Sequence, residues 1–352
     1  MINRTSFPAL PHSWSELTWQ QLCDCWQVKV CYGGNADVAR AAAVLALCGC
    51  SVCPRDTTTY STETGETVYT LADGDGSLWL VTPRDLSQMA IQALPWFDYP
   101  YGDPGKEAVR DEKGKVIEEA VDPVRGYVSQ MRDAMILPEQ ELEVDGVLFA
   151  LPQMACNNLT WQQYRSLQAL APMLFQEGMS DGDVLELQAE FLSHILVPAR
   201  ENTAAGDRFA PKHDFTYNTE RAEQTVVFWK KKLAASLDSR NDAITEYRKN
   251  GKAAKRQEAA VLFHICFQCY QTALTYYAGA YPLLFSDGDK KDQMKDALQG
   301  EVGTINTIMK YAGYAEQQQV YDSNLPFVLD ILNTMAKEAK EIEAMNARIK
   351  HK

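Results

Sequence analysis

The chain contains the pentapeptide Leu-Thr-Trp-Gln-Gln twice, at Leu17–Gln21 and again at Leu159–Gln163. In each copy a Gln follows the Thr by three residues. This is the spacing of a capping box, in which the two side chains satisfy each other's backbone N–H groups at a helix start. An apolar run follows each copy, so both copies predict a helix, the first beginning at Trp19. We expect Trp19 and Trp161 to anchor these helix starts in the core, and Asn158 to cap the second helix.

Strand signals are confined to a few short segments. Thr67–Leu71 and Leu78–Val81 predict a hairpin, to which residues 57–60 add a third strand. A second hairpin is expected at 142–150, turning at Asp145-Gly146. Thr82-Pro83 predicts the N-cap and first residue of a helix that ends before Pro95. Long helices are expected at 36–47, 183–197, 219–249, 254–279, 290–312 and 325–349.

These patterns predict a mainly α protein (α+β), made of helical lobes with small antiparallel β-hairpin additions. Four segments follow from the shifts in composition. They are an N-terminal helical lobe with a β-hairpin (1–96), an acidic extended arm or linker (97–138), a second helical lobe beginning with the repeated pentapeptide (139–200) and a C-terminal helical region (201–352). Within the arm, a small hairpin is expected around Gly114.

The charge of the chain bears on its partners and its compartment. A formal net charge of -13 argues against nucleic-acid binding, which needs clustered Lys and Arg. No apolar run reaches the roughly 20 residues that cross a bilayer, so no membrane role is expected. The first residues lack the apolar core of a secretory signal. We therefore expect a cytoplasmic protein.

The nine cysteines are the clearest candidates for a metal site. Cys48, Cys50 and Cys53 lie close together, and zinc takes four thiolate or imidazole ligands. Their spacing matches no paired CxxC knuckle, so we interpret the cysteines as buried free thiols of a reducing compartment, with metal binding as the alternative. Cys266 and Cys269 are expected on a packed helix face, and His194 is expected to be a core histidine.

Catalytic motifs are missing from the sequence. It contains no Gly-x-Ser-x-Gly, no P-loop and no dinucleotide fingerprint. We therefore expect neither an enzyme nor a cofactor.

The C-terminal helix carries a heptad pattern. Val328, Met335 and Ile342 recur every seven residues, and Leu332 lies on the adjoining seam. These four residues are the candidates for binding a protein partner. Docking of the same helix onto its own domain is the alternative, with tyrosines of the preceding long helix helping to form the dock, namely Tyr270, Tyr276, Tyr277 and Tyr281.

Three stretches carry a resemblance to a known group of proteins: Asn158–Tyr164, Glu190–Pro198 and the run from Glu301 to Asn346. They resemble proteins encoded in phage and prophage tail gene clusters near the tape-measure gene, for which no catalytic positions are known. The resemblance covers the second half of the chain and, more loosely, residues 14–49.

The resemblance implies a phage tail assembly factor, a chaperone that binds the tape-measure protein in the host cytoplasm. Known chaperones of this kind are commonly smaller, so the strand-bearing lobe and acidic arm would be additions. Two alternatives remain open. One is a structural component of the tail or its initiator complex, and the other is a cytoplasmic helical adaptor without a phage role.

Overall fold

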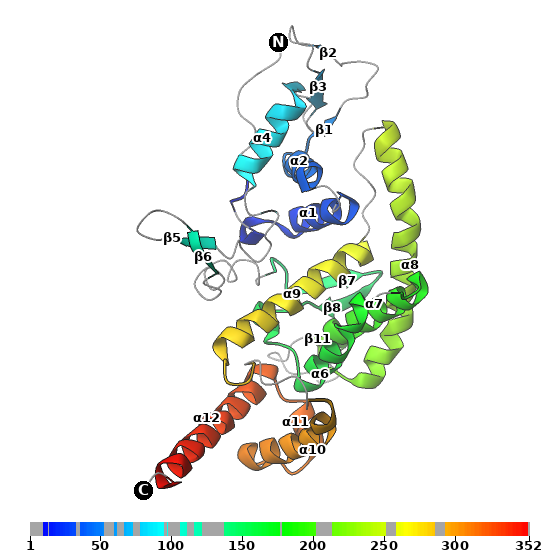
Figure 1. The fold of residues 1–352 in the computed structure, drawn as a ribbon. Coiled ribbons are helices and arrows are strands. Elements are labelled where there is room, and N and C mark those ends of the chain that lie inside the picture. Colours follow the sequence, from blue (N-terminus) through cyan, green and yellow to red (C-terminus); the bar gives the residue numbers. More distant parts are fainter. Residues whose placement is uncertain are drawn as a thin grey trace, which may run out of the picture. The chain divides into compact units, whose positions relative to one another are not determined.

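A computed structural model gives the fold of the chain (Figure 1). It describes residues 10–12, 14–32, 36–52, 60–61, 67–72, 78–94, 97, 106–110, 116–121, 137–176, 178–201, 213–250, 258–285 and 293–350. Over these residues the chain is mainly helical, and its strands form small antiparallel sheets. The predicted fold class is confirmed. No helix in these ranges has both the length and the apolar character needed to cross a membrane.

The chain forms two compact units, and each unit is built from two separate stretches of sequence. Unit 1 comprises residues 1–139 and 228–268, and unit 2 comprises residues 140–227 and 269–352. Two long helices, α8 (Thr219–Asn250) and α9 (Glu258–Ala280), therefore contribute residues to both units. The division into four consecutive segments stays a prediction.

Unit 1 begins with a helix pair, a four-stranded sheet and a further helix. The elements are η1 (Trp14–Glu16), α1 (Trp19–Tyr32), α2 (Ala36–Leu47), β1 (Ser51–Val52), β2 (Tyr60–Ser61), β3 (Thr67–Ala72), β4 (Leu78–Val81) and α4 (Pro83–Ala93). β3 pairs antiparallel with each of the other strands, so the predicted hairpin is confirmed. Of the third strand predicted at 57–60, only Tyr60 is described, and it lies in β2; β1 was not predicted. Leu71 and Val81 of the sheet form a buried cluster with Leu45 of α2.

Helix α4 begins as its sequence predicts. Thr82 is the N-cap, and its hydroxyl accepts a hydrogen bond from the Asp85 backbone N–H at 3.0 Å. Pro83 takes the first helical position, where a missing N–H removes no helix hydrogen bond. The helix ends at Ala93, before Pro95.

The predicted small hairpin around Gly114 is present. β5 (Lys106–Arg110) pairs antiparallel with β6 (Val116–Val121). Most of the remaining residues of the predicted acidic arm lie outside the described ranges.

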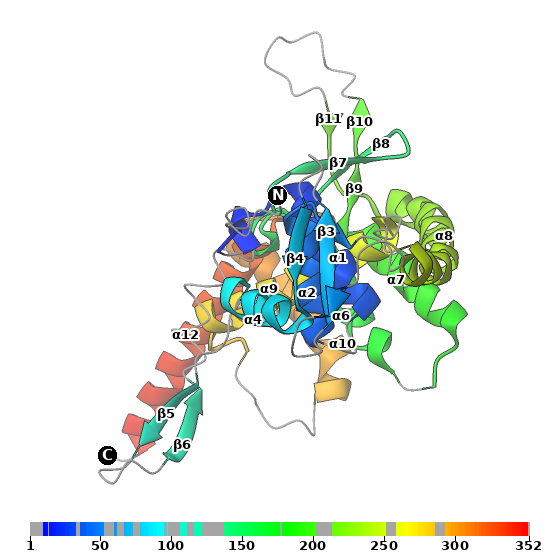
Figure 2. The same ribbon diagram turned by 90° about the horizontal axis from the view of Figure 1, so that it is seen from above.

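Unit 2 combines short strands with helices. Its elements are β7 (Glu141–Val144), β8 (Val147–Ala150), η2 (Met154–Cys156), α6 (Trp161–Leu170), η3 (Met173–Phe175), α7 (Asp181–Ile195), β9 (Val197–Pro198), β10 (Arg200–Glu201), β11 (His213–Asp214), α10 (Gln293–Ala312), α11 (Gln317–Tyr321) and α12 (Leu325–Lys350). β7, β8 and β9 form one antiparallel sheet, and β10 pairs with β11 (Figure 2). The predicted long helices are confirmed within a few residues, whereas the five-residue helix α11 was not predicted.

The hairpin of β7 and β8 turns at the residues that the sequence indicates. Asp145 has a φ of 50° and Gly146 a φ of 78°. Two successive positive φ values give a turn whose twist matches that of the flanking strands, and Asp-Gly is a favoured pair for it. The prediction of this turn is confirmed.

Candidate functional site

The two copies of the repeated pentapeptide form the same helix cap. In the first copy, the Thr18 hydroxyl accepts from the Gln21 N–H at 3.3 Å, and Gln21 Oε1 accepts from the Thr18 N–H at 3.0 Å. In the second, Thr160 and Gln163 make the same two bonds at 3.2 and 2.9 Å. The sequence pattern thus fixes an identical local structure twice.

The prediction that Asn158 caps the second helix is wrong. Thr160 is the N-cap, and Asn158 instead closes the loop before it. Its Oδ1 accepts from the Gln153 N–H at 2.9 Å, and its Nδ2 donates to the Leu151 carbonyl at 3.0 Å. Asn158 was a reasonable candidate because Asn is a favoured N-cap residue, but the Thr–Gln box satisfies the same helix end.

A turn with the same hydrogen-bond spacing leads into each pentapeptide, although the second starts from Cys156, whose φ is positive. The Leu17 N–H donates to the Trp14 carbonyl at 3.4 Å, and the Leu159 N–H donates to the Cys156 carbonyl at 3.1 Å. Each turn brings its Leu into the core, where both are buried.

The second copy makes long-range side-chain bonds. Gln163 Nε2 donates to the His194 carbonyl at the end of α7 at 2.7 Å. Gln162 Nε2 donates to the Thr219 hydroxyl at the start of α8, also at 2.7 Å. Gln163 is 1% exposed, so its amide is committed to the helix cap and to the His194 carbonyl.

The backbone of the second copy is paired as well. The Trp161 N–H donates to the Ser323 carbonyl at 2.8 Å, and the Leu325 N–H donates to the Leu159 carbonyl at 2.9 Å. Thr160 and Asn324, which lie between these donors and acceptors, form an isolated antiparallel bridge. The start of α12 therefore lies across the start of α6.

His194 is held by a tyrosine. Its Nδ1 lies 2.7 Å from the Tyr217 hydroxyl. Burial lowers the pKa of His194 to about 4, so the imidazole is neutral at pH 7. Burial also raises the pKa of Tyr217 to about 12, so this hydroxyl stays protonated. This pair fits the interpretation of His194 as a core histidine.

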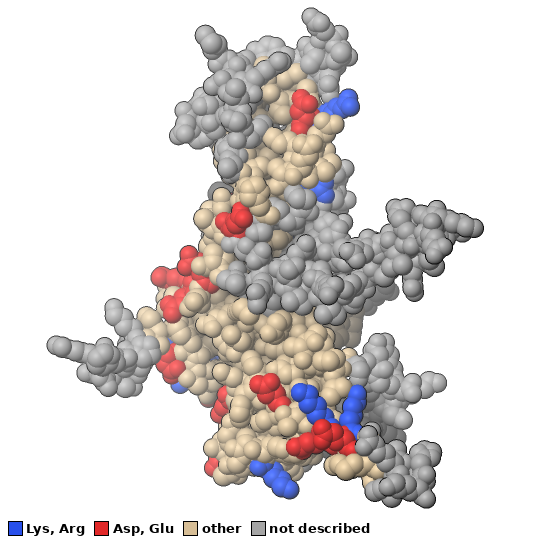
Figure 3. Space-filling model, turned by 90° about the vertical axis from the view of Figure 1, so that its left-hand side faces the viewer, with Lys and Arg blue, Asp and Glu red and all other residues tan. Residues whose placement is uncertain are grey.

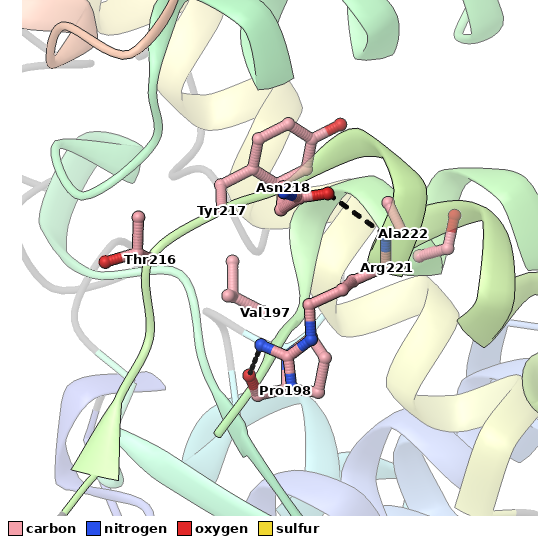
Figure 4. A pocket seen from close by; sticks show the side chains of 8 residues that line it. Val197, Pro198, Thr216, Tyr217, Asn218, Arg221 and Ala222 are labelled. Atoms are coloured by element: carbon pink, nitrogen blue, oxygen red, sulfur yellow. Dashed lines mark hydrogen bonds between the residues drawn. The ribbon is translucent and has the colours of Figure 1, made fainter. Parts of the chain in front are cut away.

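A small hollow lies between β9 and the start of α8 (Figure 4). It encloses no space that a water molecule could occupy. It is lined by Ser193, Val197, Pro198, Thr216, Tyr217, Asn218, Arg221 and Ala222. The Arg221 guanidinium donates to the carbonyls of Pro198 at 3.3 Å and Ala199 at 3.4 Å. Pockets for small molecules are usually at least about 300 Å³, and the charged group here already serves the fold.

Lys29 of unit 1 lies among three aromatic rings that sequence reasoning did not connect. Its Nζ is 5.5 Å from the ring centroid of Trp14, 5.6 Å from that of Trp26 and 4.8 Å from that of Phe97. Ring faces attract a cation, so this cluster stabilises the ammonium. Burial acts in the opposite direction and lowers the pKa of Lys29 to about 8, with Arg40 adding to the shift and Cys25 opposing it.

The cysteines of the predicted metal alternative are described only in part. Cys48 and Cys50 are half-buried free thiols, and burial raises the pKa of Cys48 to about 12. Cys53 lies outside the described residues. Within the described ranges, no three His, Cys, Asp or Glu side chains are grouped as metal ligands. Cys266 and Cys269 are buried on α9, so the predicted packed helix face is confirmed.

The predicted partner-binding residues of α12 have different environments. Val328 is fully buried in unit 2, whereas Leu332 and Met335 are half-buried. Ile342 is 55% exposed, and Met345 beside it on the next turn is equally exposed. The first half of α12 is therefore part of its own core, and its second half presents apolar side chains to solvent.

Tyrosines tie α12 to the rest of unit 2. The Tyr281 hydroxyl donates to Asp330 Oδ1 at 2.8 Å, and the Tyr311 hydroxyl donates to the carboxylate of Glu338. Tyr281 is one of the four tyrosines that the sequence predicts to help hold the C-terminal helix against its own domain.

Basic side chains lie among acidic ones on the face drawn in Figure 3, within the described part of the surface.

Comparisons of the chain with protein-family models, with curated proteins and with solved structures found no match.

Proposed function

We propose that the protein is a phage tail assembly factor, a non-enzymatic chaperone that binds the tape-measure protein in the host cytoplasm. The resemblance to proteins of phage tail gene clusters supplies the biological context. The observation that carries the proposal is the second half of α12, where Ile342 and Met345 are each 55% exposed. An exposed apolar stripe on a helix is the usual way to bind another amphipathic helix.

The charge of the chain supports a role as a soluble binding factor. A net charge of -13 makes copies of the protein repel one another and favours basic partners. A tape-measure protein is a long helix that needs cover until the tail assembles around it. A chaperone with an exposed apolar stripe and an acidic surface meets that need.

The proposal places a tape-measure gene in the same gene cluster, and it is tested by co-expression with that tape-measure protein, followed by affinity pull-down and size exclusion. We expect a stable complex and a higher soluble yield of the partner. The variant Ile342→Asp with Met345→Asp should lose the complex, because a charge on the stripe opposes apolar contact. The matched control is Thr334→Asp with Ala344→Asp, which adds two charges at exposed positions of the same helix and should keep it.

Other outcomes would favour the alternatives. If no complex forms and the protein is found in purified tails, it is a structural component of the tail or its initiator complex. If it neither binds a tail protein nor enters particles, the reading as a helical adaptor without a phage role replaces the proposal. A complex that survives both double variants equally would move the binding surface away from α12.

A further inference from the structure

The first copy of the pentapeptide is more open than the second, although both have the same local structure. Leu17 is as buried as Leu159, but every other position differs in one direction. Thr18 and Gln20 are exposed, and Trp19 and Gln21 are half-buried. In the second copy, Thr160 and Gln162 are half-buried, and Trp161 and Gln163 are buried.

The cause of this difference is the cover over the second copy. There, Ser323 and Leu325 pair with the backbone on either side of Thr160, and α11 and α12 pack against α6. The first helical turn of α12 supplies apolar contacts, because Leu325 and Val328 are almost fully buried. The second copy therefore shows what this motif holds: an extended residue followed by an apolar helix start.

The first copy keeps the same bonding groups without that cover. In the part of the chain that the structure describes, neither the Trp19 N–H nor the Leu17 carbonyl has a hydrogen-bond partner. These groups correspond to the Trp161 N–H and the Leu159 carbonyl, both of which are paired. Among the described residues, the side chain of Gln20, the counterpart of Gln162, bonds only to Asp24 on its own helix, at 2.8 and 2.9 Å.

We propose that the start of α1, residues Leu17–Gln21, is a docking site for the start of a helix presented by a partner protein. The partner segment has the chemistry of Ser323–Val328: a small polar residue, an extended residue directly before the helix, and apolar side chains in the first helical turn. It adds one antiparallel bridge to Leu17 and Trp19 and covers the half-exposed Trp19 indole. This site does not depend on the second half of α12, so it stands or falls separately from the proposed function.

The fit to a helix start follows from the direction of the free groups. A donor at Trp19 and an acceptor at Leu17 flank one residue, which is the pattern of an antiparallel bridge. A single bridge gives little affinity, so the apolar first turn of the partner must supply the rest. In the second copy both contributions are present at once.

A synthetic peptide of this chain's own residues 322–336 is the probe, with a photo-crosslinker at its C-terminus. The full-length protein is used in two variants, Trp19→Ala and Trp19→Pro. Both remove the indole, but only proline removes the N–H. Proline is well tolerated at the first helical position, so the helix is kept. We expect the peptide to bind the Pro variant several-fold to about tenfold more weakly than the Ala variant, as for the loss of one hydrogen bond.

The crosslinks should map to α1 and the turn before it. A peptide with N-methylated Leu325 lacks the N–H that would donate to the Leu17 carbonyl. It should bind the Ala variant as weakly as the unmodified peptide binds the Pro variant. Equal affinity of the two variants, or crosslinks confined to residues 159–163, would overturn the proposal, since the second copy would then be exchanging its own cover. Dimerisation of the Ala variant that the Pro variant lacks would assign the site to a second copy of this chain and refute the partner.

Discussion

The same substitution in the two copies of the pentapeptide should have very different effects on stability. Replacing Gln21 by Glu keeps an acceptor for the Thr18 N–H, which Gln21 Oε1 accepts at 3.0 Å. Glu is a standard residue at this position of a capping box, and its charge is favourable beside a helix N-terminus. We expect Gln21→Glu to leave the free energy of unfolding unchanged or to raise it by up to about 1 kcal/mol.

Replacing Gln163 by Glu changes a different environment. Gln163 is 1% exposed, and its Nε2 donates to the His194 carbonyl at 2.7 Å. An ionised Glu loses this donor, leaves the carbonyl without its partner at about 1–3 kcal/mol, and buries a charge against it. We expect Gln163→Glu to lower the free energy of unfolding by about 3 kcal/mol or more at pH 7.

The destabilisation should depend on pH. Burial raises the pKa of a carboxyl at position 163 above its unfolded value of about 4.3, so the folded state binds the proton more tightly. Stability of the variant relative to wild type therefore falls as pH rises through the folded pKa. It recovers in acid, where the protonated carboxyl again donates to the carbonyl of His194.

Urea unfolding at pH 4.5 and pH 7 measures the global effect, and hydrogen exchange of peptides from α1 and α6 measures each helix separately. The reasoning fails if the two substitutions shift stability equally. It also fails if Gln163→Glu is as mild at pH 7 as at pH 4.5.

Three further outcomes are expected. The stability of the wild type relative to a Lys29→Met variant should rise between about pH 8 and pH 10.5. The reason is that the pKa of Lys29 falls from 10.5 to about 8 on folding, so the folded state loses the proton first and no longer bears the cost of a buried charge. A stability difference in urea unfolding that stays constant across this pH range would contradict the prediction. Val328→Ala should lower the free energy of unfolding by about 2 kcal/mol, whereas Ile342→Ala should change it by less than about 0.5 kcal/mol, because Val328 is buried and Ile342 is exposed. Urea unfolding measures both, and equal effects would contradict the prediction. Gly146→Ala should cost about 1 kcal/mol because its φ is 78°, and an unchanged thermal midpoint would refute that.

Local signals predicted local structure well. The Thr–Gln spacing predicted the cap of α1, Thr82-Pro83 predicted the start of α4, and Asp145-Gly146 predicted the turn of a hairpin. Each depends on hydrogen bonds or backbone angles within a few residues. The error at Asn158 had the same origin, because two adjacent residue types both favour an N-cap and only the geometry chooses between them.

Long-range pairing could not be predicted in the same way. Identical pentapeptides gave no sign that Trp161 would be buried under the start of α12 while Trp19 stays half-exposed. Phe97 is far in sequence from Trp14 and Lys29, so their cluster had no periodic signal. The heptads predicted that α12 has an apolar stripe, but the sequence did not show which half of it is buried.

The interleaving of the two units determines when each can fold during synthesis. Unit 1 needs residues 228–268, so its first 139 residues wait while the ribosome makes the stretch from 140 to 268. At about 5–20 residues per second, that wait lasts roughly 6–26 s. An incomplete unit 1 exposes apolar surface through this interval, and cutting the chain between the units leaves each half without part of its own core. Until residue 268 has been made, the residues of unit 1 therefore cannot complete their core, and this is the interval in which they are most open to misfolding.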